Sequence, residues 1–280
     1  MSLAGAHQHC IPSASELVYA RPSLRSHPDL KEKLALVIPT LREAGNLPAL
    51  LRRVREALDL LGQSYEILVV DDDSRDGTVD IITAIAREDA RVRLLVRKGQ
   101  TGLSGAVLHG WRHTDAAILG AMDADLQHPP ELLPELVAAI SSGCDLAIGS
   151  RYASGGALGR WNPARRLLSS AAVWMTAPIQ KPDLRASDPM SGYFFVRREC
   201  LEGIAFRQQG FKLLLEILVR ARIRSLKEIP FRFGRRSRGA SKANLKVACD
   251  FGRLLARLYR TRFSVRGTIP IESFVRQEAD

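Results

Sequence analysis

Five short apolar runs recur between residues 34 and 150, and each is followed by a polar loop and a stretch of helical period. The runs cover residues 34–38, 66–70, 92–96, 116–122 and 145–148. Their length and content are typical of buried strands. Strands that alternate with helices favour a mostly parallel sheet with helices on both faces. The sequence therefore predicts an α/β fold.

The fourth run delivers two carboxylates at its C-terminal end. Asp123 and Asp125 follow it, then Gln127, and Pro129-Pro130 favour the start of a helix. Ligands of open α/β sheets bind at this end of the strands, and such oxygen ligands suit Mg²⁺ or Mn²⁺. Side chains two residues apart on an extended chain lie roughly 6.6–6.8 Å apart. Unless the chain bends, we expect one Asp on the metal and the other on a sugar hydroxyl or a water. For the tripeptide alone, a solvated loop is the alternative.

A second acidic loop follows the second run. Asp71, Asp72 and Asp73 are adjacent and repel one another. A chain accepts that cost mainly where a ligand binds, and the N–H and O–H donors of a nucleotide base or ribose would use those acceptors. Helix capping is the alternative for Ser74 and Asp76.

The positive charge is concentrated in the second half of the chain. Of the net +11, residues 212–266 contribute +13, with 16 Lys and Arg against 3 Asp and Glu. Such a face suits phosphorylated substrates, a membrane surface or nucleic acid. Nucleic acid is disfavoured, because aromatic residues are only 6% of the chain and are not interleaved with the basic ones.

The chain divides into four segments. We expect a mobile extension over residues 1–30, a main domain over 31–242, an amphipathic helix over 243–265 and a tail over 266–280. The uncharged run at residues 167–180 is too short and polar to cross a bilayer, and the N-terminus has no signal-peptide pattern. The four cysteines are scattered, which predicts a reducing compartment and no disulfide framework.

The C-terminal third carries three notable features. Residues 210–218 predict a helix in which Glu216 either pairs with an arginine or faces the active cleft. Residues 234–242 form a basic loop whose guanidinium groups can surround a phosphate. Residues 243–263 predict a helix with one apolar side flanked by Lys and Arg, which suits packing on the domain or lying on an anionic lipid surface.

Four motifs together resemble the family 2 glycosyltransferases of GT-A (Rossmann-like) fold. They are Val37-Ile38-Pro39-Thr40, Val70-Asp71-Asp72-Asp73-Ser74, Met122-Asp123-Ala124-Asp125 and Gly149-Ser150-Arg151-Tyr152. Longer stretches, at residues 125–131, 188–192, 210–212 and 233–242, resemble the polyprenol (dolichol) phosphate mannosyltransferases within that family. The resemblance covers roughly residues 34–262.

The resemblance implies GDP-mannose as donor and a polyprenyl phosphate as acceptor. The donor-binding residues would be Pro39, Leu41, Glu43, Val70, Asp72, Asp123, Ala124, Asp125, Gln127, Lys212, Arg236 and Lys242. Asp125 and Gln127 would hold Mg²⁺ or Mn²⁺, with Asp123 nearer the ribose. Asp123, Asp125 and Arg236 would carry catalysis, and Arg151, Arg165 and Ser169 would meet the acceptor phosphate.

The implied reaction needs no strong base. A phosphate with a second pKa near 6 is largely ionised at neutral pH, so its oxygen needs positioning. No histidine stands in a convincing catalytic setting, and we expect His128 at a helix start. One displacement would invert the anomeric centre. The resemblance also implies a peripheral enzyme on the cytoplasmic face of an anionic membrane, with a separate membrane subunit as a candidate partner.

Two departures and one rival accompany the resemblance. The family usually has Tyr-Asn where this chain has Leu41-Arg42, so a tyrosine near the nucleotide is missing. Some relatives continue into transmembrane helices, which we do not expect here. A UDP-sugar-dependent glucosyl- or aminosugar transferase stays open as the alternative. A sugar nucleotidyltransferase is disfavoured, because no Gly-rich, basic loop follows the first strand.

Overall fold

The computed structural model describes residues 32–157, 163–206, 212–234 and 245–263; at 163–168, 245–248 and 262–263 it describes the helix backbone alone. The strands are β1 (Leu34–Thr40), β2 (Tyr65–Asp71), β3 (Val92–Val96), β4 (Ile118–Ala121), β5 (Leu146–Ser150), β6 (Phe194–Arg197) and β7 (Leu226–Pro230). The α-helices are α1 (Leu47–Asp59), α2 (Thr78–Glu88), α3 (Leu103–Arg112), α4 (Leu133–Ser141), α5 (Pro163–Thr176), α6 (Leu213–Arg220) and α7 (Leu245–Phe263). Short 3-10 turns lie at η1 (Pro130–Leu132), η2 (Pro182–Leu184) and η3 (Arg198–Leu201). The predicted extension 1–30 and tail 266–280 lie outside the described residues.

The strands form one seven-stranded sheet in the order β3-β2-β1-β4-β6-β5-β7. Neighbouring strands pair in parallel except at β6, which runs antiparallel to both β4 and β5. The predicted mostly parallel sheet is confirmed. The last strand, β7, lies at the edge of the sheet beside β5.

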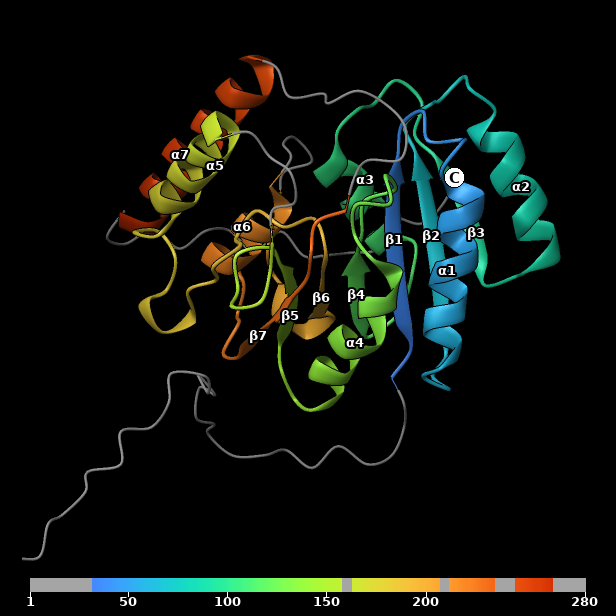
Figure 1. Ribbon diagram of the computed structural model, residues 1–280, viewed down its shortest axis with the longest axis horizontal. Coiled ribbons are helices and arrows are strands. Elements are labelled where there is room, and N and C mark those ends of the chain that lie inside the picture. Colours follow the sequence, from blue (N-terminus) through green and yellow to red (C-terminus); the bar gives the residue numbers. More distant parts are fainter. Residues whose placement is uncertain (1–31, 158–162, 207–211, 235–244, 264–280) are drawn as a thin grey trace, which may run out of the picture.

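Helices cover both faces of the sheet, and the alternation of side chains along β1 explains why. Leu34, Leu36 and Ile38 pack into one apolar cluster with α1 and α4, whereas Ala35 and Val37 pack into another with α3 and α6. Successive side chains of a strand point to opposite faces, so a continuous apolar run feeds both cores. Figure 1 shows α1 and α4 in front of the sheet.

The helix α7 packs against α6 and the end of α5, away from the sheet (Figure 1). Leu254, Leu255 and Leu258 bury their side chains there together with Leu215 of α6. This answers the question that the sequence left open at Glu216, which is buried and pairs with Arg220 at 2.6 Å and with Arg257 of α7 at 4.0 Å. Glu216 therefore joins two helices.

The longest described helix, α7, has 19 residues. Neither it nor any other helix in the described ranges combines the length and the apolarity that a bilayer crossing requires.

Candidate active site

The end of β1 and the loop after it donate hydrogen bonds to three side chains at the end of β2 and in its loop. The Thr40 hydroxyl donates to Asp71 at 2.9 Å, the Arg42 N–H to the Ser74 hydroxyl at 2.8 Å, and the Ala44 N–H to Asp76 at 3.2 Å. The Asp76 carboxylate also accepts the N–H and hydroxyl of Thr78 at the start of α2. The capping interpretation of Asp76 is therefore confirmed.

Asp72 is held by a buried arginine that the sequence analysis missed. The Arg97 guanidinium, 2% exposed, lies 2.6 Å from one Asp72 oxygen, and the Gly102 N–H donates to the other at 2.9 Å. Because Asp71 pairs with Val96 in the sheet register, the next residues of the two chains meet. The sequence carries no signal for this register, so the Arg97–Asp72 pair could not be found from it. The pair fixes both the carboxylate and the start of α3.

The other predicted donor residues of this region have different surroundings. Val70 is fully buried in the core under α3. Pro39 lines a hollow beside Asp123, Leu41 is partly exposed in the next loop, and Glu43 accepts a hydrogen bond of 2.6 Å from Asn46.

The Asp123–Gln127 segment is a bent turn. β4 ends at Ala121, and Leu126 has a φ of 61°, in the left-handed region. Ala124 is buried in the core below, while the Asp123 side chain is 31% exposed. Asp125 is buried and accepts the Gln127 N–H at 3.1 Å. The chain is therefore bent at residues 124–126. The distance that an extended chain would set between the Asp123 and Asp125 side chains does not apply here.

Gln127 connects this turn to the start of the basic loop. Its amide nitrogen donates to the Gly234 carbonyl, and the Gly234 N–H donates to the Gln127 carbonyl, both at 3.0 Å. A Cβ on Gly234 would lie 3.2 Å from the Leu126 carbonyl oxygen, so this close approach favours glycine. The predicted residues Arg236 and Lys242 lie outside the described residues.

His128, expected at a helix start, does precede η1, but it is also the centre of a buried aromatic cluster. Its ring stacks on Tyr193 with 5.1 Å between centroids and meets Phe231 and Phe233 edge-on. Its Nδ1 accepts the Asp123 N–H at 3.4 Å. Burial lowers the pKa of His128 to about 4, so the ring is neutral at pH 7. The sequence offered no signal for this contact, because Tyr193 is remote along the chain.

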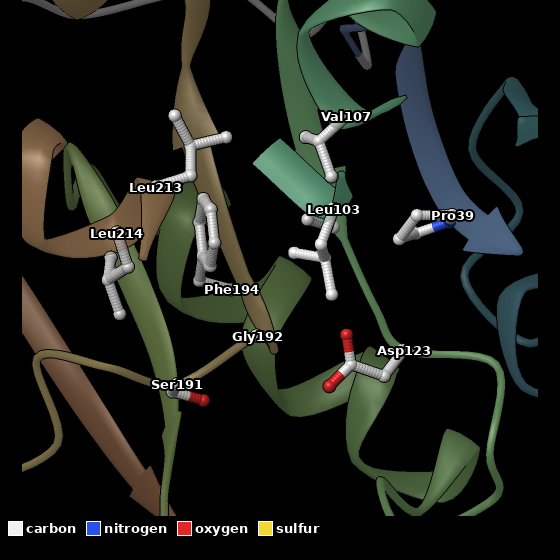
Figure 2. Close-up of a pocket in the computed structure, with 10 residues that line it drawn as sticks. Pro39, Leu103, Val107, Asp123, Ser191, Gly192, Phe194, Leu213 and Leu214 are labelled. Carbon is white, nitrogen blue, oxygen red and sulfur yellow. The ribbon is translucent and has the colours of Figure 1, made fainter. Parts of the chain in front are cut away.

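A hollow separates the acidic turn from the start of α6. Figure 2 shows the Asp123 carboxylate directed into it, between Leu103 and the turn at Ser191 and Gly192. Leu213 and Leu214 form much of the opposite wall.

Two cations, Arg151 and Lys212, lie close enough to Asp123 for its charge to act on both. Arg151 donates to both oxygens of the buried Asp188, at 2.7 and 2.8 Å. Burial lowers the pKa of the neighbouring Lys212 ammonium and Arg151 lowers it further, while Asp123 and Asp188 raise it. Ser169 accepts a hydrogen bond of 2.7 Å from Tyr152. Arg165 belongs to α5, but its side chain lies outside the described residues.

The residue types of the turn fit a hard divalent cation, because Asp123, Asp125 and Gln127 offer carboxylate and amide oxygens. In the described ranges, a different group has three ligand atoms within 4.8 Å of one another: Asp145, Glu199 and Cys200. It lies at the opposite end of the strands, before the start of β5 and after the end of β6. Burial raises the pKa of the Cys200 thiol to about 12, and Asp145 pairs with Arg224, so this group is unsuited to a metal.

Comparisons with known proteins agree with this geometry. The model of glycosyl transferase family 2 matches residues 35–205. A dolichol-phosphate mannosyltransferase of Pyrococcus furiosus is 41% identical over 81% of this chain and 64% of its own length. One of Mycosarcoma maydis is 38% identical over 85% of this chain and 81% of its own.

Solved structures share the architecture. Glucosyl-3-phosphoglycerate synthase of Mycobacterium tuberculosis, in complex with Mn²⁺, UDP and phosphoglyceric acid, superposes with a TM-score of 0.61. The identity is 19%, over 89% of this chain and 86% of that one. This likeness, with the sheet described above, confirms the predicted fold class.

Proposed function

Because this chain belongs to glycosyl transferase family 2, we propose that it transfers mannose from GDP-mannose to a polyprenyl (dolichyl) phosphate, giving polyprenyl β-D-mannosyl phosphate. The names of its relatives support the sugar and the acceptor class. The observation that carries the proposal is the acidic residue Asp123, which lines the hollow and lies close enough to Arg151 and Lys212 for its charge to act on both.

On the donor side, Asp125 and Gln127 would hold Mg²⁺ or Mn²⁺, with Asp123 nearer the ribose. When bound there, the ion would supply positive charge to the diphosphate leaving group. Asp72, fixed by Arg97, presents acceptors toward the base. Lys212, and from the basic loop Arg236 and Lys242, supply positive charge to the phosphates.

On the acceptor side, the described residues suit a nucleophile that is already ionised. The Asp188 carboxylate is engaged by Arg151, and His128 is buried with a low pKa. A phosphate oxygen, ionised above a pKa near 6, needs no base. It forms a bond to the anomeric carbon as the bond from that carbon to the GDP oxygen breaks, with inversion. Arg151, Arg165 and Ser169 position this phosphate.

The lipid acceptor requires contact with a membrane surface, which we assign to α5 and α7. Trp174 at the end of α5 is 78% exposed, and Arg253 and Arg260 are exposed on α7. Aromatic and basic side chains are typical of peripheral membrane contacts. We assign the cytoplasmic face, because its leaflet carries the anionic lipids. A separate membrane subunit is a further candidate partner.

A donor-specificity assay tests the proposed function. Purified enzyme is given Mg²⁺ or Mn²⁺, polyprenyl phosphate in vesicles, and either GDP-mannose or UDP-glucose. We expect kcat/KM for GDP-mannose to be larger by roughly two orders of magnitude, as for a site built to hydrogen-bond one base. A preference for UDP-glucose would instead support the UDP-sugar alternative.

The same assay tests the metal residues. Asp125→Ala should abolish metal-dependent transfer, whereas Asp80→Ala, which removes an exposed carboxylate on α2, should leave it unchanged. Full activity in Asp125→Ala would overturn the metal assignment.

A further inference from the structure

Tyr152 joins the loop after β5 to the helix α5. Its hydroxyl donates to the Ser169 hydroxyl at 2.7 Å. Its backbone is fixed at the other end, because the buried Ser150 hydroxyl accepts the N–H groups of Tyr152 at 3.4 Å and of Ala153 at 3.0 Å. The Tyr152 ring is therefore held at both ends, by a tight turn and by a helix.

The same ring lies under the Arg151 guanidinium. Its centroid is 5.7 Å from the Arg151 Cζ, and that of Phe233 is 5.3 Å away. Two hydrogen bonds to Asp188 fix the plane of the guanidinium. Tyr152 thus contacts both a cation and a hydroxyl that we have assigned to the acceptor phosphate.

The direction of the Tyr152–Ser169 bond has a chemical consequence. A serine hydroxyl has one donor and two acceptor positions. The phenol is the more acidic of the two hydroxyls, so it is the better donor to the Ser169 oxygen, which leaves the Ser169 proton available to another acceptor. A guanidinium together with an available O–H donor is suited to a group with several anionic oxygens.

We propose that Tyr152 is a positioning residue for the acceptor phosphate, which orients the Ser169 hydroxyl and supports Arg151. This inference rests on the proposed function, since it concerns the acceptor of that same reaction. The contacts of Tyr152 described above are with Ser150, Ser169 and Arg151, so we expect it to act on acceptor binding and to leave nucleotide binding unchanged.

The chain offers a matched control. The Tyr259 hydroxyl of α7 donates to the Met175 carbonyl near the end of the same helix α5, at 2.9 Å. Tyr259→Phe removes a tyrosine hydrogen bond to α5 without touching Ser169 or Arg151. This variant therefore shows how the loss of one tyrosine hydrogen bond to α5, by itself, changes the kinetics.

A double-mutant cycle tests the inference. The full chain, Tyr152→Phe, Ser169→Ala, the double variant and Tyr259→Phe are assayed for kcat and for the KM of polyprenyl phosphate at saturating GDP-mannose. The Kd of GDP with Mn²⁺ is measured by calorimetry.

We expect Tyr152→Phe to raise the acceptor KM about five- to thirty-fold, the equivalent of one hydrogen bond. The double variant should be no worse than Ser169→Ala alone, because both remove one interaction. The Kd of GDP should stay unchanged, as should every parameter of Tyr259→Phe.

Three results would overturn the inference: an unchanged acceptor KM in Tyr152→Phe, additive effects of the two substitutions, or an equal effect of Tyr259→Phe. Each of these leaves the proposed function intact. A wild-type chain that transfers nothing to polyprenyl phosphate would overturn both proposals, so the two failures are distinguishable.

Discussion

At the scale of the residue, the closest packing in the active site lies between Gly192 and Asp123. A Cβ on Gly192 would stand 2.8 and 2.9 Å from the two oxygens of the Asp123 carboxylate. Carbon and oxygen atoms that are not bonded do not approach so closely without displacement. The glycine therefore lets the carboxylate turn into the hollow seen in Figure 2.

Gly192→Ala should displace the Asp123 carboxylate and lower kcat/KM by about 100-fold, the usual result of a misplacement near 1 Å in a site. The fold should be retained, because the side chain that moves is partly exposed. Steady-state kinetics and a melting curve measure the two effects. Gly252→Ala on α7 is the control, since its Cβ would meet nothing within 4 Å and alanine suits a helix. Wild-type kinetics in Gly192→Ala would contradict the assignment of Asp123.

Some residues of the site could be predicted from the sequence, and others could not. Asp123, Asp125 and Gln127 could be placed, because they follow one apolar run along the chain. Arg97 and His128 could not, since their roles depend on partners in other strands: Asp72 for the arginine, and Tyr193 for the histidine.

At the scale of the element, the N-terminal end of β2 carries a buried carboxylate in a cluster of cations. Glu66 lies 2.8 Å from Lys33 and 2.6 Å from Arg93, and it also accepts from the Thr114 hydroxyl. Burial raises the pKa of Glu66, but the hydrogen bonds from Lys33, Thr114 and Arg93 outweigh it, so the pKa lies below its ordinary value of 4.5.

Acid should therefore weaken the fold through Glu66. A carboxyl group whose pKa is lower in the folded state than in the unfolded state stabilises the folded protein. This stabilisation is complete above the unfolded pKa, near 4.5, and it disappears as the pH falls through the folded pKa. In urea titrations between pH 6 and 3, Glu66→Gln should be less stable at pH 6 and should lose less stability on acidification. Glu135→Gln, which changes an exposed carboxylate on α4, should keep the wild-type slope. Identical slopes for Glu66→Gln and wild type would refute this role.

Elements with a regular local period could be predicted from the sequence, whereas their partners could not. The antiparallel place of β6 between β4 and β5 depends on pairing between distant segments, which no local period reveals. The pairing of Glu216 with α7 is likewise a contact between distant segments.

At the scale of the whole molecule, α5 and α7 lie side by side at the end of the sheet that is remote from β3 (Figure 1). Trp174 is exposed on this pair of helices. On the other side, Leu60 at the end of α1 is 81% exposed. The two residues allow the proposed membrane side to be compared with an equally exposed apolar residue elsewhere.

The full chain should bind vesicles that contain anionic lipid better than neutral ones, and the difference should shrink as salt rises. Trp174→Ala should weaken partitioning into anionic vesicles roughly five- to tenfold, since a buried large side chain contributes about 1.5–3 kcal/mol and this one inserts in part. Vesicle sedimentation measures the partitioning. Leu60→Ala should leave it unchanged. Equal binding to neutral and anionic vesicles at low salt would reject the membrane assignment.

The place of β6 in the sheet also has a consequence in time. β4 ends at Ala121 and β6 at Arg197, so at roughly 5–20 residues per second the ribosome takes about 4–15 s to make what lies between. During that interval the backbone N–H and C=O groups on one side of β4 have no strand to pair with. Such unpaired edges are templates for pairing with other chains. The speed of synthesis, and any chaperone that shields this edge, thus bear on how much active enzyme a cell obtains.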